Sequence, residues 1–169
     1  MSRPTNPSFD VAHLGHVELL TNKFTESLSF FTTVYGLSCS SIKDGSAYLR
    51  AWDDYEYHTL KLTKSATTGV GHIGYRVSSP EALDRRVEAI AASGYKVHGW
   101  TDGDEGHGRA FRFEDPFGHL FELYWETSRY QPHPDLDQPA LKNMASRFNP
   151  VGPRRLDQLN LLAGDVAEY

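Results

Sequence analysis

Two histidines stand at equivalent positions in a pattern that the chain repeats. His16 opens one short apolar run, and His72 opens a similar run 56 positions later. Each run leads into a segment with helical spacing that ends at a glycine, Gly36 in the first case and Gly94 in the second. The repetition predicts two copies of one structural unit, with the histidines at matching places in them.

Glu122 adds a carboxylate to these two imidazoles. It interrupts the apolar run 121–125, where a charged side chain that faces a sheet interior costs free energy unless it is paired or bound to a metal. If each unit forms a four-stranded sheet and the two sheets close into a cup, His16, His72 and Glu122 face one cavity. Two histidines and one carboxylate with free coordination positions form the facial arrangement of non-haem Fe(II) oxygenases, which also accommodates Mn, Zn or Ni. The sequence therefore predicts a metal site at these three residues.

Other roles for the same residues stay open at this point. His16 and His72 can each be hydrogen-bonded strand histidines, and Glu122 can pair with Arg76 or Arg112 instead of a metal. Metal binding requires all three ligands on one cavity.

His58 lies near the cavity in this arrangement. There it would serve as a hydrogen-bond donor to a ligand or as an acid/base, and the alternative is a solvated strand histidine. We assign no role to the histidines that the pattern places in loops or at strand ends: His13, His98, His107, His119 and His133.

The elements that would carry these side chains follow the same order in both halves. In the first half we expect a strand, a helix and three strands at 14–20, 24–34, 38–42, 47–52 and 58–62. In the second half we expect the same order at 73–77, 80–93, 96–100, 110–113 and 120–125, with Ser79 as N-cap and Gly94 as the stop. This predicts an α+β fold in which βαβββ units at 12–65 and 69–126 pair to form a cup. The polar loop 101–108 is the segment that we expect to be most mobile.

Three glycines, Gly69, Gly71 and Gly74, satisfy the G-x-G-x-x-G spacing of a dinucleotide-binding loop. That spacing binds a nucleotide when the glycines follow a strand and open a helix. Here they run into the strand at 73–77, so the pattern does not predict nucleotide binding. The sequence also contains no G-x-S-x-G, P-loop, C-x-x-C or H-E-x-x-H pattern.

Beyond residue 126 the composition changes to prolines among polar residues, without an apolar period. We expect residues 1–126 to form one module and residues 127–153 to form a proline-rich connector. Residues 154–169 look like the start of another strand, in which Gln158 takes the place of the earlier histidines. Two interpretations of this last segment remain open: the beginning of a second module, or a vestigial tail.

The composition limits the partners that the protein can have. A formal net charge of −5 gives no general attraction for nucleic acid, and no apolar run is long enough to span a bilayer. The single cysteine, Cys39, has apolar neighbours that predict a packed thiol, and it agrees with a reducing compartment, so we expect a cytoplasmic protein. Tyr124, Trp125 and the unpaired final strand predict apolar surface and free edges, and hence a homo-oligomer.

The sequence resembles the vicinal oxygen chelate superfamily in several stretches, which are 14–19, 48–52, 71–77 and 112–124. It is most similar to the amino-terminal module of two-module extradiol ring-cleavage dioxygenases of the catechol 2,3-dioxygenase type. Residues 155–161 resemble the opening of the second module of such enzymes.

The resemblance implies a mononuclear Fe(II), or occasionally Mn(II), and O₂-dependent opening of a small aromatic diol beside its hydroxyls. In two-module members the metal belongs to the second module, which uses a histidine where this chain has Gln158. His16, His72 and Glu122 match the three ligand positions of a metal-bearing module, whereas Arg112 stands about where active modules carry an acid/base tyrosine.

We therefore predict an extradiol dioxygenase of aromatic catabolism, or its amino-terminal module. Two alternatives belong to the same superfamily. One is a non-catalytic module for assembly or for binding a small ligand, and the other is a glyoxalase-like metalloenzyme.

Overall fold

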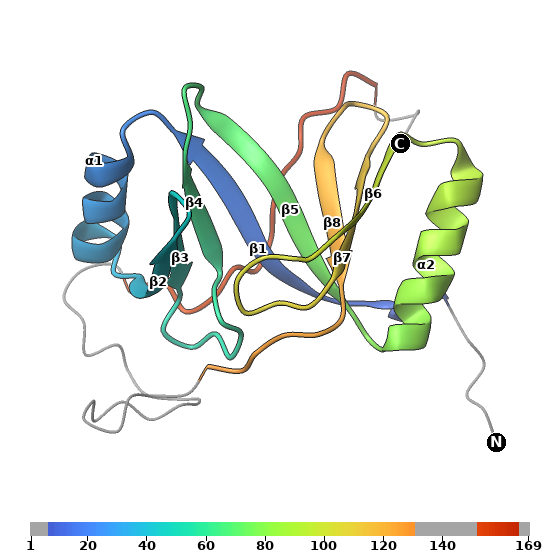
Figure 1. The fold of residues 1–169 in the computed structure, drawn as a ribbon, viewed down its shortest axis with the longest axis horizontal. Coiled ribbons are helices and arrows are strands. Elements are labelled where there is room, and N and C mark those ends of the chain that lie inside the picture. Colours follow the sequence, from blue (N-terminus) through green and yellow to red (C-terminus); the bar gives the residue numbers. More distant parts are fainter. Residues whose placement is uncertain (1–6, 131–151, 166–169) are drawn as a thin grey trace.

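The computed structural model describes residues 7–130 and 152–165 (Figure 1). A short 3-10 helix, Pro7–Phe9, precedes the first unit. That unit consists of β1 (Val11–Thr21), α1 (Phe24–Ser29), a π-helical turn (Phe30–Val34), β2 (Ser38–Lys43), β3 (Ser46–Arg50) and β4 (Leu60–Lys64). The second unit consists of β5 (Gly69–Val77), α2 (Pro80–Ser93), β6 (Val97–Thr101), β7 (Ala110–Glu114) and β8 (Leu120–Tyr124).

One eight-stranded sheet contains all the strands of the described residues, in the order β2-β3-β4-β1-β5-β8-β7-β6. β1 and β5 run antiparallel at its centre, and each pairs in parallel with the last strand of its own unit, β4 or β8. Outward from the centre, each half places its first, fourth, third and second strand in that order, as an approximate two-fold relation between the units requires. The α+β class with paired βαβββ units is thus confirmed. The two halves are not separate sheets, because β1 and β5 pair from Val11–Val77 to Leu20–Gly69.

Alternation along the central strands separates the two faces of the sheet. Val17 and Leu19 of β1 pack in the apolar cluster that includes α1, and Tyr75 and Val77 of β5 pack in the cluster that includes α2. Because Val17 lies opposite Ile73, these odd-numbered residues share one face, and both helices cover it at opposite ends of the sheet (Figure 1). His16 and Glu18 of β1 and His72 and Gly74 of β5 therefore point to the other face, which we call the inner face.

The second helix begins and ends where the sequence predicts. Ser79 Oγ accepts a hydrogen bond from the backbone N–H of Ala82 at 3.1 Å, and Pro80 occupies the first turn. Gly94 ends the helix with a φ of +83°, a left-handed conformation that glycine adopts without steric cost.

The first helix is regular for fewer residues than predicted. Its α-helical part ends at Ser29 and a π-helical turn continues to Val34. Thr32 Oγ1 donates to the Leu28 carbonyl at 2.8 Å, and Thr33 Oγ1 donates to the Ser29 carbonyl at 2.6 Å. Threonine hydroxyls thus compete with backbone N–H groups for these carbonyls, which disturbs the regular helix.

Residues 152–156 lie against the first unit, Gly164 approaches Phe117 of the second unit, and none of residues 152–165 forms the predicted strand. The backbone N–H of Trp52 donates to the Pro153 carbonyl at 3.3 Å, and that of Asp53 donates to the Arg154 carbonyl at 3.1 Å. Arg154 Nη2 also donates to the Asp53 carboxylate at 2.8 Å. Pro153 and Arg154 thus bond to the loop after β3, and residues 155–162, where we expect the last strand, adopt no regular secondary structure. Residues 131–151, most of the predicted connector, lie outside the described residues.

Cys39 is exposed, so the prediction of a packed thiol is wrong. The residue lies on β2, the outermost strand on its side of the sheet, where fewer neighbours cover a side chain. Among the described residues, no helix combines the length and the apolar character that crossing a membrane would require.

Candidate metal centre

Two imidazoles meet on the inner face of the central strands. His16 on β1 and His72 on β5 are both fully buried, and their Nε2 atoms lie 3.0 Å apart. The rings are nearly perpendicular, with an interplanar angle of 85°. The structure thus brings together the two histidines that the sequence repeat pairs.

Glycines on β5 make room for these side chains. Gly74 lies opposite His16, and a Cβ at Gly74 would lie only 2.2 Å from the ring atom Cε1 of His16. A Cβ at Gly71 would lie 2.1 Å from Glu18 Oε2. The glycine spacing that imitates a dinucleotide-binding loop therefore lies within a strand, where it leaves space for the side chains of β1.

Glu122 reaches the same place from β8, where it pairs with Gly74 in the strand register. Its Oε1 lies 3.9 Å from His16 Nε2, and its Oε2 lies 3.8 Å from His72 Nε2. Oε2 also accepts a hydrogen bond from Arg112 Nε at 2.7 Å, whereas Oε1 is buried and has no hydrogen-bond partner among the described residues. Glu122 therefore both pairs with Arg112 and keeps one oxygen available to a cation.

Asp104, which the sequence did not single out, is the carboxylate nearest to the Nε2 atoms of both histidines. Its Oδ2 lies 3.1 Å from His72 Nε2 and 3.4 Å from His16 Nε2, while its Oδ1 accepts from Lys61 Nζ at 2.6 Å. Burial alone would raise the pKa of Asp104, but the contacts with His16 and His72 outweigh it and hold that pKa well below the ordinary value. Asp104 is an anion at neutral pH, in contact with the candidate ligands.

Glu18 holds His72 from the other side of the ring. His72 Nδ1 lies 2.8 Å from Glu18 Oε2, and Thr63 Oγ1 donates to Glu18 Oε1 at 2.6 Å. Burial would raise the pKa of Glu18, but the bond and charge of His72, the Thr63 hydroxyl and the charge of Lys61 lower it to about 2. A carboxylate on the far nitrogen of a histidine is the usual support for a metal ligand, because it orients the ring and leaves Nε2 for the ion.

His58 is fully buried just before β4, so the alternative of a solvated histidine is wrong. Its ring stacks on that of His107, with 4.5 Å between the centroids, and its Nε2 lies 4.0 Å from Asp104 Oδ2. Burial, followed by the charges of His16 and His107, lowers the pKa of His58 well below its ordinary value. His58 is thus a neutral imidazole beside the candidate centre.

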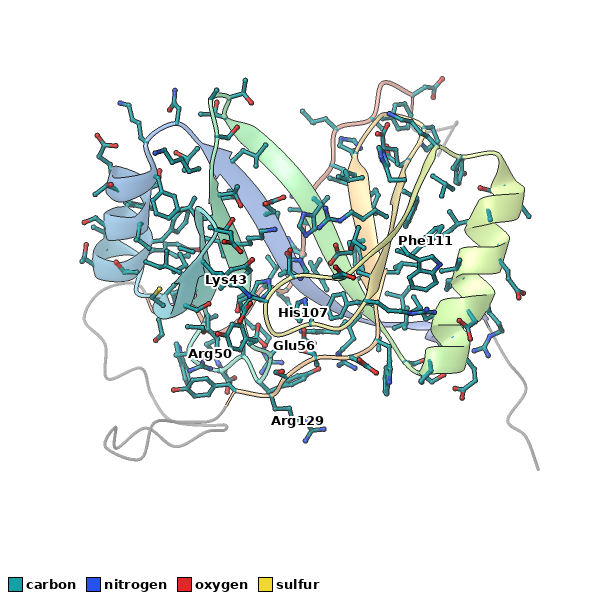
Figure 2. The ribbon with its side chains drawn as sticks, in the orientation of Figure 1. Lys43, Arg50, Glu56, His107, Phe111 and Arg129 are labelled. Carbon is teal, nitrogen blue, oxygen red and sulfur yellow. The ribbon has the colours of Figure 1, made fainter. Side chains whose placement is uncertain are left out.

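His107, to which the sequence gave no role, also belongs to this site. Its side chain is fully buried and stacks on Tyr124 with 4.2 Å between the ring centroids. Its Nε2 lies 3.6 Å from Glu56 Oε2, and both residues are labelled in Figure 2. Glu56 Oε2 accepts a hydrogen bond from the Tyr124 hydroxyl at 2.6 Å. Burial, then the charge of His16, lowers the pKa of His107 to about 2. The loop expected to be mobile is thus packed into the site.

The residues present fit a single metal ion. The ligand atoms of His16, His72, Asp104 and Glu122 all lie within 4.8 Å of one another, and all four residues are buried. Two atoms that each lie about 2.1 Å from one ion are roughly 3.0 Å apart in neighbouring octahedral positions and roughly 4.2 Å apart in opposite positions. The separations given above, from 3.0 to 3.9 Å, fall in this interval.

Comparison with known proteins finds similarity to ring-cleavage dioxygenases. Residues 70–128 match the family described as catechol 2,3-dioxygenase-like N-terminal domain. The chain is 45% identical over 160 residues to a metapyrocatechase of Geobacillus stearothermophilus, covering 94% of this chain and 49% of that protein. It is 34% identical over 161 residues to a manganese-dependent 2,3-dihydroxybiphenyl 1,2-dioxygenase of Geobacillus genomosp. 3, covering 94% and 51%.

Solved structures agree with these relatives. Homoprotocatechuate 2,3-dioxygenase from Brevibacterium fuscum, in complex with 3,4-dihydroxyphenylacetate, superposes with a TM-score of 0.69 at 29% identity, over 77% of this chain and 41% of that one. The fold is therefore that of the vicinal oxygen chelate superfamily. Within it, the chain is similar to the amino-terminal module of extradiol dioxygenases, and it spans about half the length of the curated relatives that it matches.

Proposed function

We propose that the protein takes part in extradiol cleavage of a small aromatic diol by O₂, as the amino-terminal module of a catechol 2,3-dioxygenase-like enzyme. We further propose that His16, His72 and Glu122 bind a metal ion in this module. The observation that carries the metal proposal is the convergence of their buried ligand atoms at separations that suit one ion. Fe(II) is the ion that we propose, and Mn(II) is the alternative, since one relative is named manganese-dependent.

When bound, such an ion would supply a Lewis acid and a template that holds the diol and O₂ side by side. The chain's own residues prepare the site for it. Glu18 orients the ring of His72 so that Nε2 points to the centre. We propose that His58, whose two ring nitrogens are buried without hydrogen-bond partners among the described residues, accepts the proton of the diol at Nε2.

A second candidate function is a non-catalytic module, and two observations favour it. Arg112 neutralises Glu122 and stands where the resemblance leads one to expect an acid/base tyrosine. His16 and His72 are also fully buried, so neither ring is exposed to a diol in solution. A glyoxalase-like reaction at the same metal would be a further member of the superfamily's chemistry.

Metal analysis combined with O₂ uptake tests these proposals. The purified chain is loaded anaerobically with Fe(II) or Mn(II), its metal content is measured, and O₂ uptake is followed on a panel of catechols. We expect about one ion per chain in the wild type and almost none after His72→Ala, because one of three ligands is lost. His98→Ala is the matched control, since His98 is 39% exposed and pairs with Glu114 away from the centre.

Each outcome separates the candidates. Unchanged metal content in His72→Ala would contradict the ligand assignment. Bound metal without O₂ uptake on any catechol would assign this chain to the non-catalytic alternative. Isomerase activity on a glyoxalase substrate would favour the glyoxalase-like metalloenzyme.

We also propose that the protein self-associates. β6 is the last strand on its side of the sheet, and Val97 and Trp100 on it are 41% and 42% exposed. An unpaired edge with exposed apolar side chains is a surface suited to pairing with another copy. For the location we propose the cytoplasm, because the single exposed Cys39 suits a reducing compartment.

A further inference from the structure

The loop between β6 and β7 reaches across the sheet to the candidate centre. Figure 1 shows this loop passing in front of β1 and β5. The backbone N–H of Gly108 donates to the Glu126 carbonyl at 3.0 Å, and that of Ser128 donates to the Gly106 carbonyl at 2.6 Å. Glu105 pairs with Lys43 Nζ of the first unit at 2.7 Å. The loop is thus attached to Lys43 of the first unit and to the segment after β8 of the second unit. It places Asp104 beside the two histidines.

Asp104 lies at a position suited to a metal ligand. Its Oδ2 is closer to His72 Nε2 and His16 Nε2, at 3.1 and 3.4 Å, than is either oxygen of Glu122, at 3.8 and 3.9 Å. Lys61 binds its other oxygen, Oδ1, at 2.6 Å. One oxygen of Asp104 is therefore oriented by a lysine, while the other faces the point where the histidine nitrogens meet.

The charges around the two histidine Nε2 atoms favour a bound cation. Within residues 7–130 and 152–165, the three buried carboxylates Glu18, Asp104 and Glu122 contact two permanent cations. Lys61 contacts Glu18 at 3.2 Å and Asp104 at 2.6 Å, and Arg112 contacts Glu122 at 2.7 Å. Metal ligation requires neutral histidines, and one negative charge is then left over, which is costly when it is buried without compensation. A divalent cation among the carboxylates would offset it.

We propose that Asp104 is a fourth ligand of the metal in this module, and that the ion fastens the β6–β7 loop to the central strands. This inference rests on the metal site proposed above and adds to it. Two histidines and two carboxylates leave only two positions of an octahedral ion free, enough for both oxygens of a diol but not for O₂ as well. Asp104 would have to leave the ion before a diol and O₂ could bind together, so it controls which small molecules the centre accepts.

Metal titration of the full chain tests the ligand role directly. Mn(II) affinity is measured for the wild type, Asp104→Ala, Asp104→Asn and Asp102→Ala, with circular dichroism as a check of folding. We expect the affinity to fall at least about tenfold in both Asp104 variants, as for loss of a group that supports the metal. Asp102→Ala removes an exposed acidic residue of the same loop and should bind as the wild type does.

Hydrogen exchange measures the fastening of the loop without reference to activity. Mn(II) should slow the exchange of the amides of residues 102–109 in the wild type, and it should not do so in a metal-loaded Asp104→Ala variant. At saturating Mn(II) and catechol, a third small ligand such as azide should bind this variant more tightly than it binds the wild type, because only the variant has a third position free.

The failures of the two proposals differ. If the wild type binds no Mn(II) or Fe(II), both this inference and the metal site fail. If His72→Ala abolishes binding while both Asp104 variants bind as the wild type does and the loop is protected equally, only the fourth ligand is refuted. Asp104 is then an ordinary ion-pair partner of the two histidines.

Discussion

A single methyl group at Gly74 should disable the candidate centre. The Cβ of alanine would lie 2.2 Å from Cε1 and 2.5 Å from Nδ1 of His16. Non-bonded carbon atoms approach to about 3.5–4.0 Å, so the ring must retreat by more than about 1 Å. The retreat is obstructed, because the rings of His58, His107 and Tyr124 lie with their centroids 4.6, 4.9 and 5.7 Å from that of His16.

The magnitude follows from two opposing terms. Overpacking of this kind costs about 1–3 kcal/mol, and replacing glycine in a strand returns about 0.5–1 kcal/mol. We expect Gly74→Ala to lower the free energy of unfolding by about 1–2 kcal/mol. The effect on metal binding should be larger, because His16 Nε2 moves away from the 3.0 Å contact with His72, and we expect the affinity to fall at least about 100-fold.

Urea unfolding and Mn(II) titration measure the two effects on the same samples. Gly164→Ala is the matched control, since its Cβ would meet Phe117 at an ordinary contact distance of 3.8 Å. A folded Gly74→Ala variant that binds Mn(II) as tightly as the wild type would refute the reasoning. In that case His16 would not be a ligand in the position in which the structure holds it.

Other substitutions and measurements test the fold around the centre. Asp10→Asn should cost about 2 kcal/mol, less than the ~3–5 of a fully buried pair, because Arg85, which contacts Asp10 at 2.6 Å, is 37% exposed. The hydrogen bond of Arg85 lowers the pKa of Asp10 below its ordinary value of 3.8. The loss of unfolding free energy in Asp10→Asn should therefore be largest at pH 7 and should shrink as the pH falls below 3.8. Urea unfolding that gives the same loss at pH 7 and below pH 3.8 would contradict this. Ser79→Ala should cost about 1 kcal/mol by removing the cap of α2, and Ser79→Asp should be nearly neutral in thermal unfolding; equal losses in both would argue against capping. Sedimentation at about micromolar concentration should show self-association, and a clean monomer would count against it.

Regular patterns in the sequence were sufficient for the fold. The histidine repeat, the stop at Gly94 and the alternation along 73–77 recur in the structure as β1, β5 and α2. Such patterns are readable because a strand or helix that covers a core must repeat apolar residues at a period set by its own backbone. Glu122 was also found in this way, since it interrupts the apolar residues of β8.

What the sequence determined by itself was the set of elements and the side chains that regular strands place on the inner face: His16, His72 and Glu122. Only the tertiary structure decided what surrounds them. Asp104 and His107 sit in a loop among Gly103, Gly106 and Gly108, and the sequence signal was no more than charged and imidazole groups without a period. The position of a loop depends on contacts with residues distant in the sequence, here the pairing of Glu105 with Lys43 and of Asp104 with Lys61. The sharing of Glu122 between the centre and Arg112 was likewise decided in three dimensions, because β7 and β8 place these two residues opposite each other in their register.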